Sequence, residues 1–434
     1  MQLKKSTQLK SLLTTATCAL LGTNTTTQAN ELENWQFDTA LMVYSEVDRV
    51  SAAEAIIAGK RSYDNDQVLN LKLTLDALTG ASANGAVAQP NVQTFTRPSG
   101  KGQYQANPNT TPLDDTFKDT RVQITGQWTQ PLSNDYTWSA GGNFSKEFDY
   151  MSVSANTNIA KDFNKKNTTL SAGIALAFDQ IKPKGGIPDP LTPMIISNVV
   201  NNYDNEGEDD DDGINPSSIA SSDNKTTVDL LFGITQVINR RMLVQMNYSF
   251  SQVDGYMTDP YKILSILDNN GITQEYRYEK RPDSRTKHAF YLQSKYHFTQ
   301  SIIDASYRFM TDDWGINSHT VDLRYRINLS GDQYIEPHVR FYTQTAAEFY
   351  QPFLNQGTVL PEFASADYRI GEMDTYTLGI KYGMPMKSGE KLAFRLEYYN
   401  QKPKNAGFTQ PGVLAEQQIY ESIDAIIAQV SYSF

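Results

Sequence analysis

Apolar and polar residues alternate along much of this chain. In residues 68–79, leucines 69, 71, 73 and 75 and Ala77 fall on one face, and Asn70, Lys72, Thr74 and Asp76 fall on the other. A period of two is typical of a β-strand, because a helix would spread these leucines around its circumference. The same alternation recurs in residues 242–251, 321–329 and 392–398. The sequence therefore predicts a chain built mainly of strands.

Sixteen segments carry this pattern, and most of them are long. The predicted strands are 36–46, 50–61, 67–79, 118–130, 135–146, 148–161, 167–179, 225–238, 241–253, 286–299, 301–312, 317–330, 333–347, 372–384, 390–401 and 419–434. Strands in globular sheets usually have about five or six residues, whereas a tilted membrane strand needs about 9–11. The lengths indicate strands that cross a membrane.

The connections between these strands alternate in length. Short ones fall at 62–66, 131–134, 162–166, 239–240, 300, 331–332 and 385–389, and the intervening ones include long insertions at 80–117, 181–224, 254–285, 348–371 and 402–418. Outer-membrane barrels have an even strand number, short periplasmic turns and long extracellular loops. We therefore predict an all-β fold over residues 30–434: a transmembrane antiparallel up-and-down barrel of about sixteen strands.

The first 29 residues have the order of a secretory signal. Lys4, Lys5 and Lys10 precede a short apolar stretch at 12–21, and a small residue, Ala29, ends the polar run that follows. A lipoprotein signal at Cys18 fits less well, because apolar residues continue past that cysteine. Removing residues 1–29 takes away three lysines, no acid and the single cysteine, so the net charge changes from −11 to −14. The expected mature chain then has no disulfide and no cysteine metal site.

Composition and the chain end narrow the class further. Only 39% of the 434 residues are hydrophobic and 20% are charged, which excludes a bundle of membrane helices. The excess of acidic over basic residues argues against nucleic acid as a partner. Ile426, Ala428, Val430, Tyr432 and Phe434 alternate to the last residue. This end resembles the terminal strand that the outer-membrane assembly machinery recognises, so we expect that machinery and outer-membrane lipid as partners.

Charged residues at inward positions of the predicted strands form the first candidate site. A lumen-facing set combines basic and acidic side chains on neighbouring strands: Arg308, Arg324, Arg340 and Arg395 at similar heights, Arg326 and Lys381 somewhat lower, and Asp304, Asp322, Glu336 and Glu397 among them. One interpretation is a constriction whose transverse field orients and filters polar solutes. The other is an internal ion-pair network that fills and stiffens the barrel.

The long connections contain two further candidates. A mixed set of charges and aromatic rings could form a ligand vestibule, or could pin the loops together: Asp259, Tyr261, Arg281, Asp283, Arg285, Asp312, Asp313, Trp314, Asp367 and Arg369. An acidic run places Glu208, Asp210 and Asp212 before Gly213, like the start of a calcium loop. The twelfth position is Ile219 instead of the required Glu, so weak calcium binding is an alternative to a solvated loop, and we expect no other cofactor.

Enzymatic chemistry finds little support in the sequence. His319 lies near Ser318, Asp312 and Asp313, which could in principle form a Ser-His-acid arrangement. Its position in the alternation, however, places it on the lipid face. No phosphate-binding glycine loop and no histidine pair with metal-site spacing are found. We therefore expect a protein that is not an enzyme.

Several segments of the chain resemble a known family, the domain of unknown function 3570. The resemblance rests on residues 78–85, 258–262, 278–285, 310–316, 336–340 and 361–369 and extends over essentially the whole mature chain. It implies a bacterial outer-membrane barrel and supplies no catalytic residue. Two functions remain open: porin-like passage of small polar or charged solutes, or a loop-plugged barrel that acts as a surface binding or assembly platform. The solute and the oligomeric state are open as well.

Overall fold

The computed structural model describes residues 35–97, 102–195, 218–386, 389–417 and 419–434. The predicted signal at 1–29 and the acidic run with Glu208, Asp210 and Asp212 lie outside these residues. No helix in the described ranges is long and apolar enough to cross a membrane.

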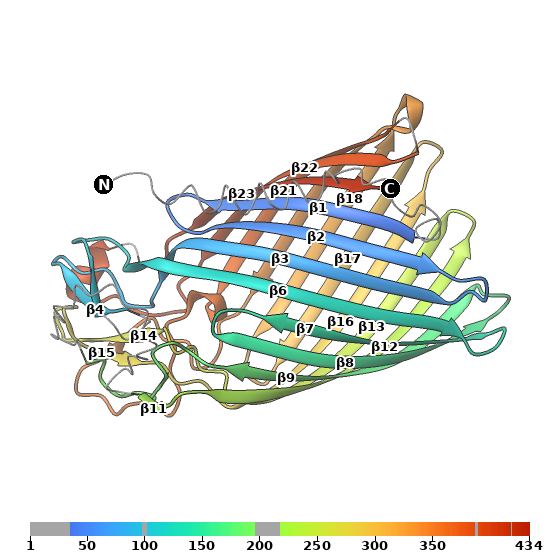
Figure 1. Ribbon diagram of the computed structural model, residues 1–434. Helices are drawn as coiled ribbons and strands as arrows, with labels where there is room; N and C mark the ends of the chain where they lie inside the picture. The colour runs from blue at the N-terminus through green and yellow to red at the C-terminus, as the bar shows by residue number, and fades with distance from the viewer. Residues whose placement is uncertain (1–34, 98–101, 196–217, 387–388, 418) are drawn as a thin grey trace, which may run out of the picture.

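Sixteen strands of the described chain close into one antiparallel barrel (Figure 1). In ring order they are β1 (Trp35–Glu46), β2 (Ser51–Ser62), β3 (Val68–Ala83), β6 (Leu113–Pro131), β7 (Tyr136–Lys146), β8 (Tyr150–Phe163), β9 (Thr168–Ile181), β12 (Asp223–Asn239), β13 (Met242–Gly255), β16 (Ser284–His297), β17 (Ser301–Asp312), β18 (Asn317–Asn328), β19 (Tyr334–Gln344), β21 (Met373–Pro385), β22 (Lys391–Pro403) and β23 (Ile423–Ser433). Each pairs with its neighbours in sequence, so the predicted up-and-down topology is confirmed.

The first and last strands close the ring. β1 pairs with β23 from Asp38↔Ser433 to Glu46↔Ala425. Beyond this ladder, Phe37 and Phe434 exchange two main-chain hydrogen bonds, with N···O distances of 2.8 and 2.9 Å. Closure leaves no unpaired strand edge in the hydrocarbon region, where an unsatisfied backbone group is costly.

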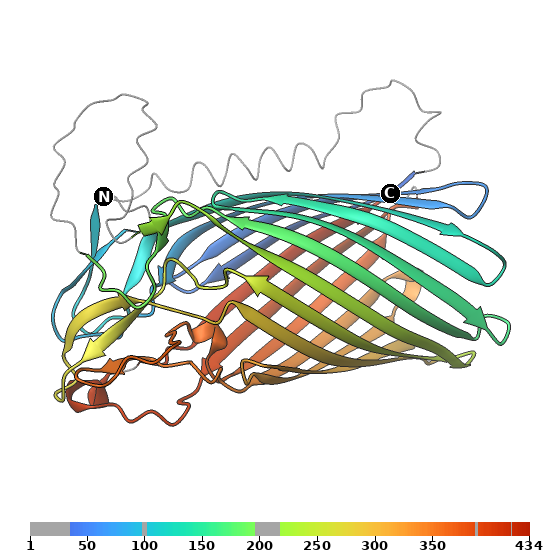
Figure 2. The same ribbon diagram turned by 90° about the horizontal axis from the view of Figure 1, so that it is seen from below.

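The two ends of the barrel differ, as the connection lengths predict. Figures 1 and 2 show the short turns and the chain end at one rim and the long connections gathered at the other. The strand bounds agree with the prediction to within a few residues at most ends. The main difference is β6, which begins at Leu113 instead of 118, because its ladder with β3 continues to Leu113↔Ala83.

The side chains on the exterior of the barrel are mainly apolar, although they are not buried by other parts of the protein. On β18, the apolar side chains of Val321 and Leu323 are 48% and 39% exposed, while Asp322 and Arg324 point to the other face. A charged side chain that faces lipid near the midplane costs about 2–4 kcal/mol. This cost fixes the register, because a slip of one residue would exchange the two faces.

Aromatic rings gather near both rims of the exterior. At the rim with the short turns, Phe37 stacks on Phe434 with ring centroids 5.4 Å apart, and on Trp35 at 5.7 Å. Towards the loops, Tyr248 contacts Phe290 at 5.1 Å and its hydroxyl lies 2.8 Å from Nδ1 of His288. Amphipathic rings favour the two membrane interfaces, so the excess of Tyr and Phe fits two aromatic girdles.

The long loops have a folded structure of their own. They contain small sheets, formed by β4 (Gln93–Thr96) with β5 (Gln103–Ala106), by β10 (Ile187–Pro188) with β11 (Ser218–Ala220), and by β14 (Ile263–Leu267) with β15 (Thr273–Tyr278) and β20 (Leu354–Asn355). All four buried apolar clusters of the described chain consist of loop residues, such as Phe95, Leu264 and Leu414, each 0% exposed.

The loops meet across the mouth of the barrel. The loop between β3 and β6 binds the loop between β13 and β16, although these hairpins lie far apart on the ring. The amide of Ile263 donates to the carbonyl of Asn84 at 2.9 Å, and the amide of Val87 donates to Oγ of Ser265 at 3.2 Å. The amide of Val413, between β22 and β23, donates to the carbonyl of Asn270 at 2.9 Å. The described loops therefore form one interlocked cap.

The assignment of the two barrel faces can be tested on neighbouring strands. We expect Leu323→Arg, on the lipid face of β18, to lower the free energy of unfolding by about 2–4 kcal/mol. Ser306→Arg, on the lumen face of β17 opposite Asp322, should change it little. Urea-dependent folding into lipid vesicles measures both values, and equal losses in the two variants would contradict the assignment.

Candidate functional site

The predicted lumen residues lie on the inner wall formed by β17, β18, β19, β21 and β22. Ladder partners place oppositely charged residues side by side: Asp304 opposite Arg324, Asp322 opposite Arg340, and Glu336 opposite Lys381. Arg395 is in turn the partner of Lys381. Direct cross-strand neighbours have Cβ atoms about 4.5–5.5 Å apart, so the register alone brings these charges together.

His338 is the centre of this wall, and the sequence analysis did not select it. Its Nδ1 lies 2.9 Å from Oε1 of Glu397, and its Nε2 lies 2.9 Å from Oδ2 of Asp322. A histidine can donate from both ring nitrogens only in its protonated form. The geometry therefore fits an imidazolium that bridges Asp322 on the adjacent strand β18 and Glu397 on β22, two strands away across Gly379.

The remaining predicted lumen residues surround this bridge. Nε of Arg324 lies 3.5 Å from Asp322, Nη1 of Arg395 lies 3.9 Å from Glu397, and Nζ of Lys295 lies 3.1 Å from Asp304. Arg326 stacks on Tyr334, with its guanidinium carbon 3.5 Å from the ring centre. A cavity of about 90 Å³ opens in the wall between Arg324, Glu336, His338, Lys381, Arg395 and Glu397.

Several basic groups of the wall stay accessible. Arg308 and Arg340 are exposed, and the side chain of Arg324 is 46% exposed. The carboxylates are less accessible, with 17% exposure for Asp322 and 7% for Glu397. The wall therefore holds its negative charges in contacts with other strands, while part of its positive charge faces the lumen.

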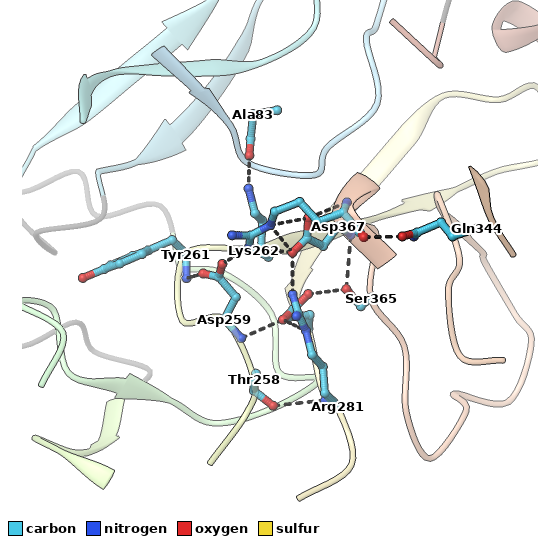
Figure 3. A network of polar contacts seen from close by, with 11 residues as sticks. Ala83, Thr258, Asp259, Tyr261, Lys262, Arg281, Gln344, Ser365 and Asp367 are labelled. Atoms are coloured by element: carbon cyan, nitrogen blue, oxygen red, sulfur yellow. Dashed lines mark hydrogen bonds and ion pairs between the residues drawn. The ribbon is translucent and has the colours of Figure 1, made fainter. Parts of the chain in front are cut away.

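A second cluster joins two loops at the mouth of the barrel, the loop between β13 and β16 and the loop between β19 and β21 (Figure 3). We call it the loop ion cluster, and it consists of Asp259, Lys262, Glu279, Arg281, Asp367 and Arg369. Four of these six were predicted for the vestibule; Glu279 and Lys262 were not. Arg281 donates to Glu279 at 2.6 Å and to Asp367 at 2.7 Å. Arg369 donates from Nε to both carboxylate oxygens of Asp367, at 2.9 and 2.8 Å.

Main-chain groups and one hydroxyl complete the cluster and connect it to β3. The amide of Asp259 donates to Oε1 of Glu279 at 2.7 Å, and Oγ of Ser365 donates to the other oxygen of that carboxylate. The ammonium group of Lys262 donates to the carbonyl of Ala83, at the end of β3. The carboxylates of Glu279 and Asp367 are 0% exposed, so nearly all their interactions are with protein.

The environment shifts the pKa values of the two buried carboxylates in opposite directions. Burial raises the pKa of Glu279 to about 7. Burial would also raise the pKa of Asp367, but Arg369, Lys262 and Arg281 outweigh it and hold that pKa well below its usual range. Glu279 thus favours the folded loops less as the pH rises from 4.5 towards 7, whereas Asp367 stabilises them above its ordinary pKa of 3.8 and loses this effect as the pH falls.

The other predicted loop residues form a separate contact on β16 and β17. Arg285 pairs with Asp312, and its guanidinium carbon lies 4.3 Å from the ring centre of Trp314. Trp314 donates its indole N–H to the carbonyl of Ser284 at 2.9 Å, and Asp313 accepts from the amide of Thr286 at 3.0 Å.

Two predicted loop residues lie apart from these contacts. Asp283 is exposed, and its carbonyl accepts from the amide of Gly255 at 2.8 Å, while its side chain has no hydrogen-bond or ion-pair partner among the described residues. Tyr261 donates instead to Asp149 at 2.5 Å. The described contacts are of the kind that hold loops together, and a ligand-binding role for this set stays a prediction.

A cavity of about 570 Å³ lies between the loops and the outer ends of β6 and β8. Its lining mixes aromatic rings with charges of both signs, among them Lys118, Phe148, Asp149, Lys184, Tyr261 and Lys262. Ligand pockets typically enclose about 300–1,000 Å³. The cavity is large enough for a small solute held at the mouth of the barrel.

Within the described residues, one group of acids has the spacing of a metal site. Asp119, Glu147 and Asp149 have carboxylate oxygens within 4.8 Å of one another. Burial and the negative charge of Asp119 raise the pKa of Glu147 to about 7. Nη1 of Arg121 lies 4.0 Å from Glu147, so this guanidinium group already balances part of the negative charge.

His319, the candidate for hydrolytic chemistry, faces away from the residues that such chemistry would need. It is exposed on the lipid face of β18, and its Nδ1 lies 2.7 Å from the hydroxyl of Tyr307. Ser318, next to it in the strand, points to the other face and is buried. The contacts fit a ring in the aromatic girdle.

The loop ion cluster can be tested by removing one buried charge. Asp367→Asn leaves the guanidinium groups of Arg281 and Arg369 without their shared carboxylate, and breaking such a buried pair costs roughly 3–5 kcal/mol. We expect hydrogen exchange in residues 258–281 and 363–371 to become roughly 100-fold faster or more. Exchange in the barrel strands should not change.

A matched control is Asp283→Asn, which neutralises an exposed aspartate outside the cluster. Lowering the pH below 3.8 should accelerate loop exchange in the wild type but much less in Asp367→Asn, after correction for the intrinsic exchange rate. Unchanged loop protection in Asp367→Asn would show that the pairs do not hold the loops.

Comparisons with solved structures identify similar barrels. The chain is 10% identical to a structure titled "Bacterial polysaccharide outer membrane secretin", covering 92% of this chain and 98% of that chain with a TM-score of 0.43. It is 7% identical to CdiB from Acinetobacter baumannii, covering 93% of this chain but 60% of that chain, with a TM-score of 0.45. For OccK2 (OpdF) from Pseudomonas aeruginosa the identity is 7%, the coverage 92% and 97%, and the TM-score 0.40.

No curated protein matches the sequence. The closed ring of sixteen strands, its apolar exterior and its long loops at one rim are those of a bacterial outer-membrane barrel. The chain belongs to the family described as "Protein of unknown function (DUF3570)", whose model matches residues 10–434.

Proposed function

We propose that this barrel passes small polar solutes across the outer membrane and favours anions. The observation that carries the proposal is the inner wall of β17 to β22, where the accessible charges are mainly basic. Arg308 and Arg340 are exposed to the lumen, whereas Asp322 and Glu397 are engaged by His338. Fixed positive charge along an aqueous path lowers the barrier for anions and raises it for cations.

The loop cap would restrict access to this path. Loops from distant strands hydrogen-bond to one another, so a solute must pass between them or through the cavity of about 570 Å³ beside Lys118 and Lys184. A mouth of this kind selects by size before the lumen selects by charge. We propose a non-enzymatic role, since His319 lies on the lipid face and contacts Tyr307.

A second candidate is a surface binding or assembly platform without transport. It is favoured by the packing of the loops, because they have buried apolar clusters and small sheets like those of a folded domain. A rigid outer surface of this kind suits recognition of a partner. The two candidates differ in one property: only the first requires a continuous aqueous path.

Ion selectivity tests the channel proposal. Purified protein in a planar bilayer should conduct, and in a salt gradient its reversal potential should indicate anion preference. The double variant Arg308→Gln with Arg340→Gln removes two positive charges that face the lumen. It should therefore lower the anion-to-cation permeability ratio by about twofold or more. Arg240→Gln with Arg241→Gln removes two exposed arginines from the turn between β12 and β13 and serves as the matched control.

Two results would contradict the proposal in different ways. If the folded wild-type protein carries no current, the barrel is not a channel and the platform role is favoured. If it conducts but both double variants retain the wild-type selectivity, the basic wall does not line the path.

A further inference from the structure

The cavity of about 570 Å³ at the mouth of the barrel contains positive and negative groups that do not pair with one another. We call it the mouth cavity. Lys118 and Lys184 line it, and neither lysine forms an ion pair with any described residue. Asp119 and Asp149 line it as well, and no ion pair joins these acids to the two lysines within the described chain. One cavity therefore offers charges of both signs to a ligand.

The other charged groups of the described lining have partners in the protein. Asp259, Lys262 and Arg369 belong to the loop ion cluster, where each contacts another loop residue or a main-chain carbonyl. Arg97 donates from Nε to a main-chain carbonyl at 3.2 Å, and Asp114 is only 5% exposed. The groups left to bind a solute are thus the two lysines and the two acids.

The acids have little positive charge around them. Carboxylate oxygens of Asp119, Glu147 and Asp149 lie within 4.8 Å of one another. Arg121 lies 4.0 Å from Glu147, but it also pairs with Asp76 at 2.8 Å, so one guanidinium group serves several carboxylates. Burial raises the pKa of Asp149, which means that its charged form is disfavoured. A positive group of a ligand placed beside these carboxylates would stabilise their charged form.

Two aromatic rings complete the lining. Phe148, between β7 and β8, is 63% exposed, and Nζ of Lys184 lies 5.6 Å from the centre of its ring. Tyr261 points away from the loop ion cluster, and its hydroxyl donates to Asp149 at 2.5 Å (Figure 3). Ligand pockets commonly combine apolar surface with a few polar groups that fix orientation. The mouth cavity has both.

We propose that the mouth cavity binds a small zwitterion, a solute with both an ammonium and a carboxylate group, such as an amino acid or a short peptide. The ammonium group contacts Asp119 and Asp149. The carboxylate contacts Lys118 and Lys184, and the ring of Phe148 packs against the uncharged part. A solute with one charge would compensate only one pair of groups and leave the other desolvated without a partner, which costs free energy. The proposal does not depend on solute passage.

Three probes of one size separate the contributions of the two charges. A volume of about 570 Å³ leaves room for a dipeptide. Dialanine carries both charges, N-acetyl-dialanine carries only the carboxylate, and dialanine amide carries only the ammonium group. Each probe is titrated into folded protein in detergent by isothermal titration calorimetry. We expect dialanine to bind the wild type about tenfold or more tightly than either analogue, because each analogue lacks one set of charge-assisted contacts.

Two double variants each remove one sign of charge from the cavity. Lys118→Gln with Lys184→Gln should weaken dialanine binding about tenfold, and this variant should bind dialanine and its amide equally. Asp119→Asn with Asp149→Asn should weaken it similarly and should bind dialanine and N-acetyl-dialanine equally. Asparagine can still accept the two main-chain hydrogen bonds that Asp119 receives at 2.7 and 3.2 Å, so this change keeps the local structure.

Matched controls lie in the short turns at the other rim. Lys165→Gln with Lys166→Gln, and Asp64→Asn with Asp66→Asn, remove the same charges from exposed positions. Both controls should bind all three probes as the wild type does. The heat-modifiable mobility that reports a folded barrel should be the same for every variant.

Three outcomes would overturn the proposal. The folded wild type could fail to bind dialanine, either analogue could bind as tightly as dialanine, or both cavity variants could retain the wild-type affinity. In a separate titration, calcium binding that is lost in Asp119→Asn with Asp149→Asn, without any binding of dialanine, would identify a metal site instead. Since conductance is not measured, none of these results bears on the channel proposal.

Discussion

The pairing of β1 with β23 is the contact on which the rest of this structure depends. In hydrocarbon, a free strand edge would expose unpaired N–H and C=O groups at several kcal/mol each, so the sheet must close. The ladder from Asp38↔Ser433 to Glu46↔Ala425 closes it, and the two hydrogen bonds between Phe37 and Phe434 continue it to the chain end. Once the ring is closed, each strand has an outer and an inner face, and the alternation of side chains decides which residues meet lipid and which meet the lumen.

The loops are held together by different interactions from the strands. Buried ion pairs such as those of Arg281 and Asp367 contribute little net stability, because desolvation offsets most of the attraction. They are costly to break, however, and the hydrogen-bond geometry admits few alternatives. This explains why the loop ion cluster joins segments from β3, from the loop after β13 and from the loop after β19, while the apolar clusters around Phe95 and Leu264 supply the burial. The segments on which the family resemblance rests include residues 258–262, 278–285 and 361–369, and these are the segments that meet there.

The strands could be predicted because one local property, a period of two, determines both their length and their faces. The lumen wall followed from the same property, and it would also have identified His338, which lies between Glu336 and Arg340 in the alternation. The loop ion cluster could not be predicted to the same extent. Nothing local distinguishes Glu279, which is fully buried, from Asp283 four residues later, which is exposed. Their burial depends on Ser365 and Asp367, distant in sequence, and loops have no period that would place these residues together.

The same charged side chains therefore act differently in three environments of one molecule. Arg324 faces the lumen, where water weakens its pairing with Asp322. Arg281 is nearly buried among carboxylates, where the low dielectric makes each contact specific and leaves little charge to act elsewhere. Lys146, at the outer end of β7, is exposed on the opposite face of the barrel wall from Arg121. Position on a strand face or within the loops, more than residue type, decides whether a charge on this barrel faces the lumen, joins loops or lies on the outer surface.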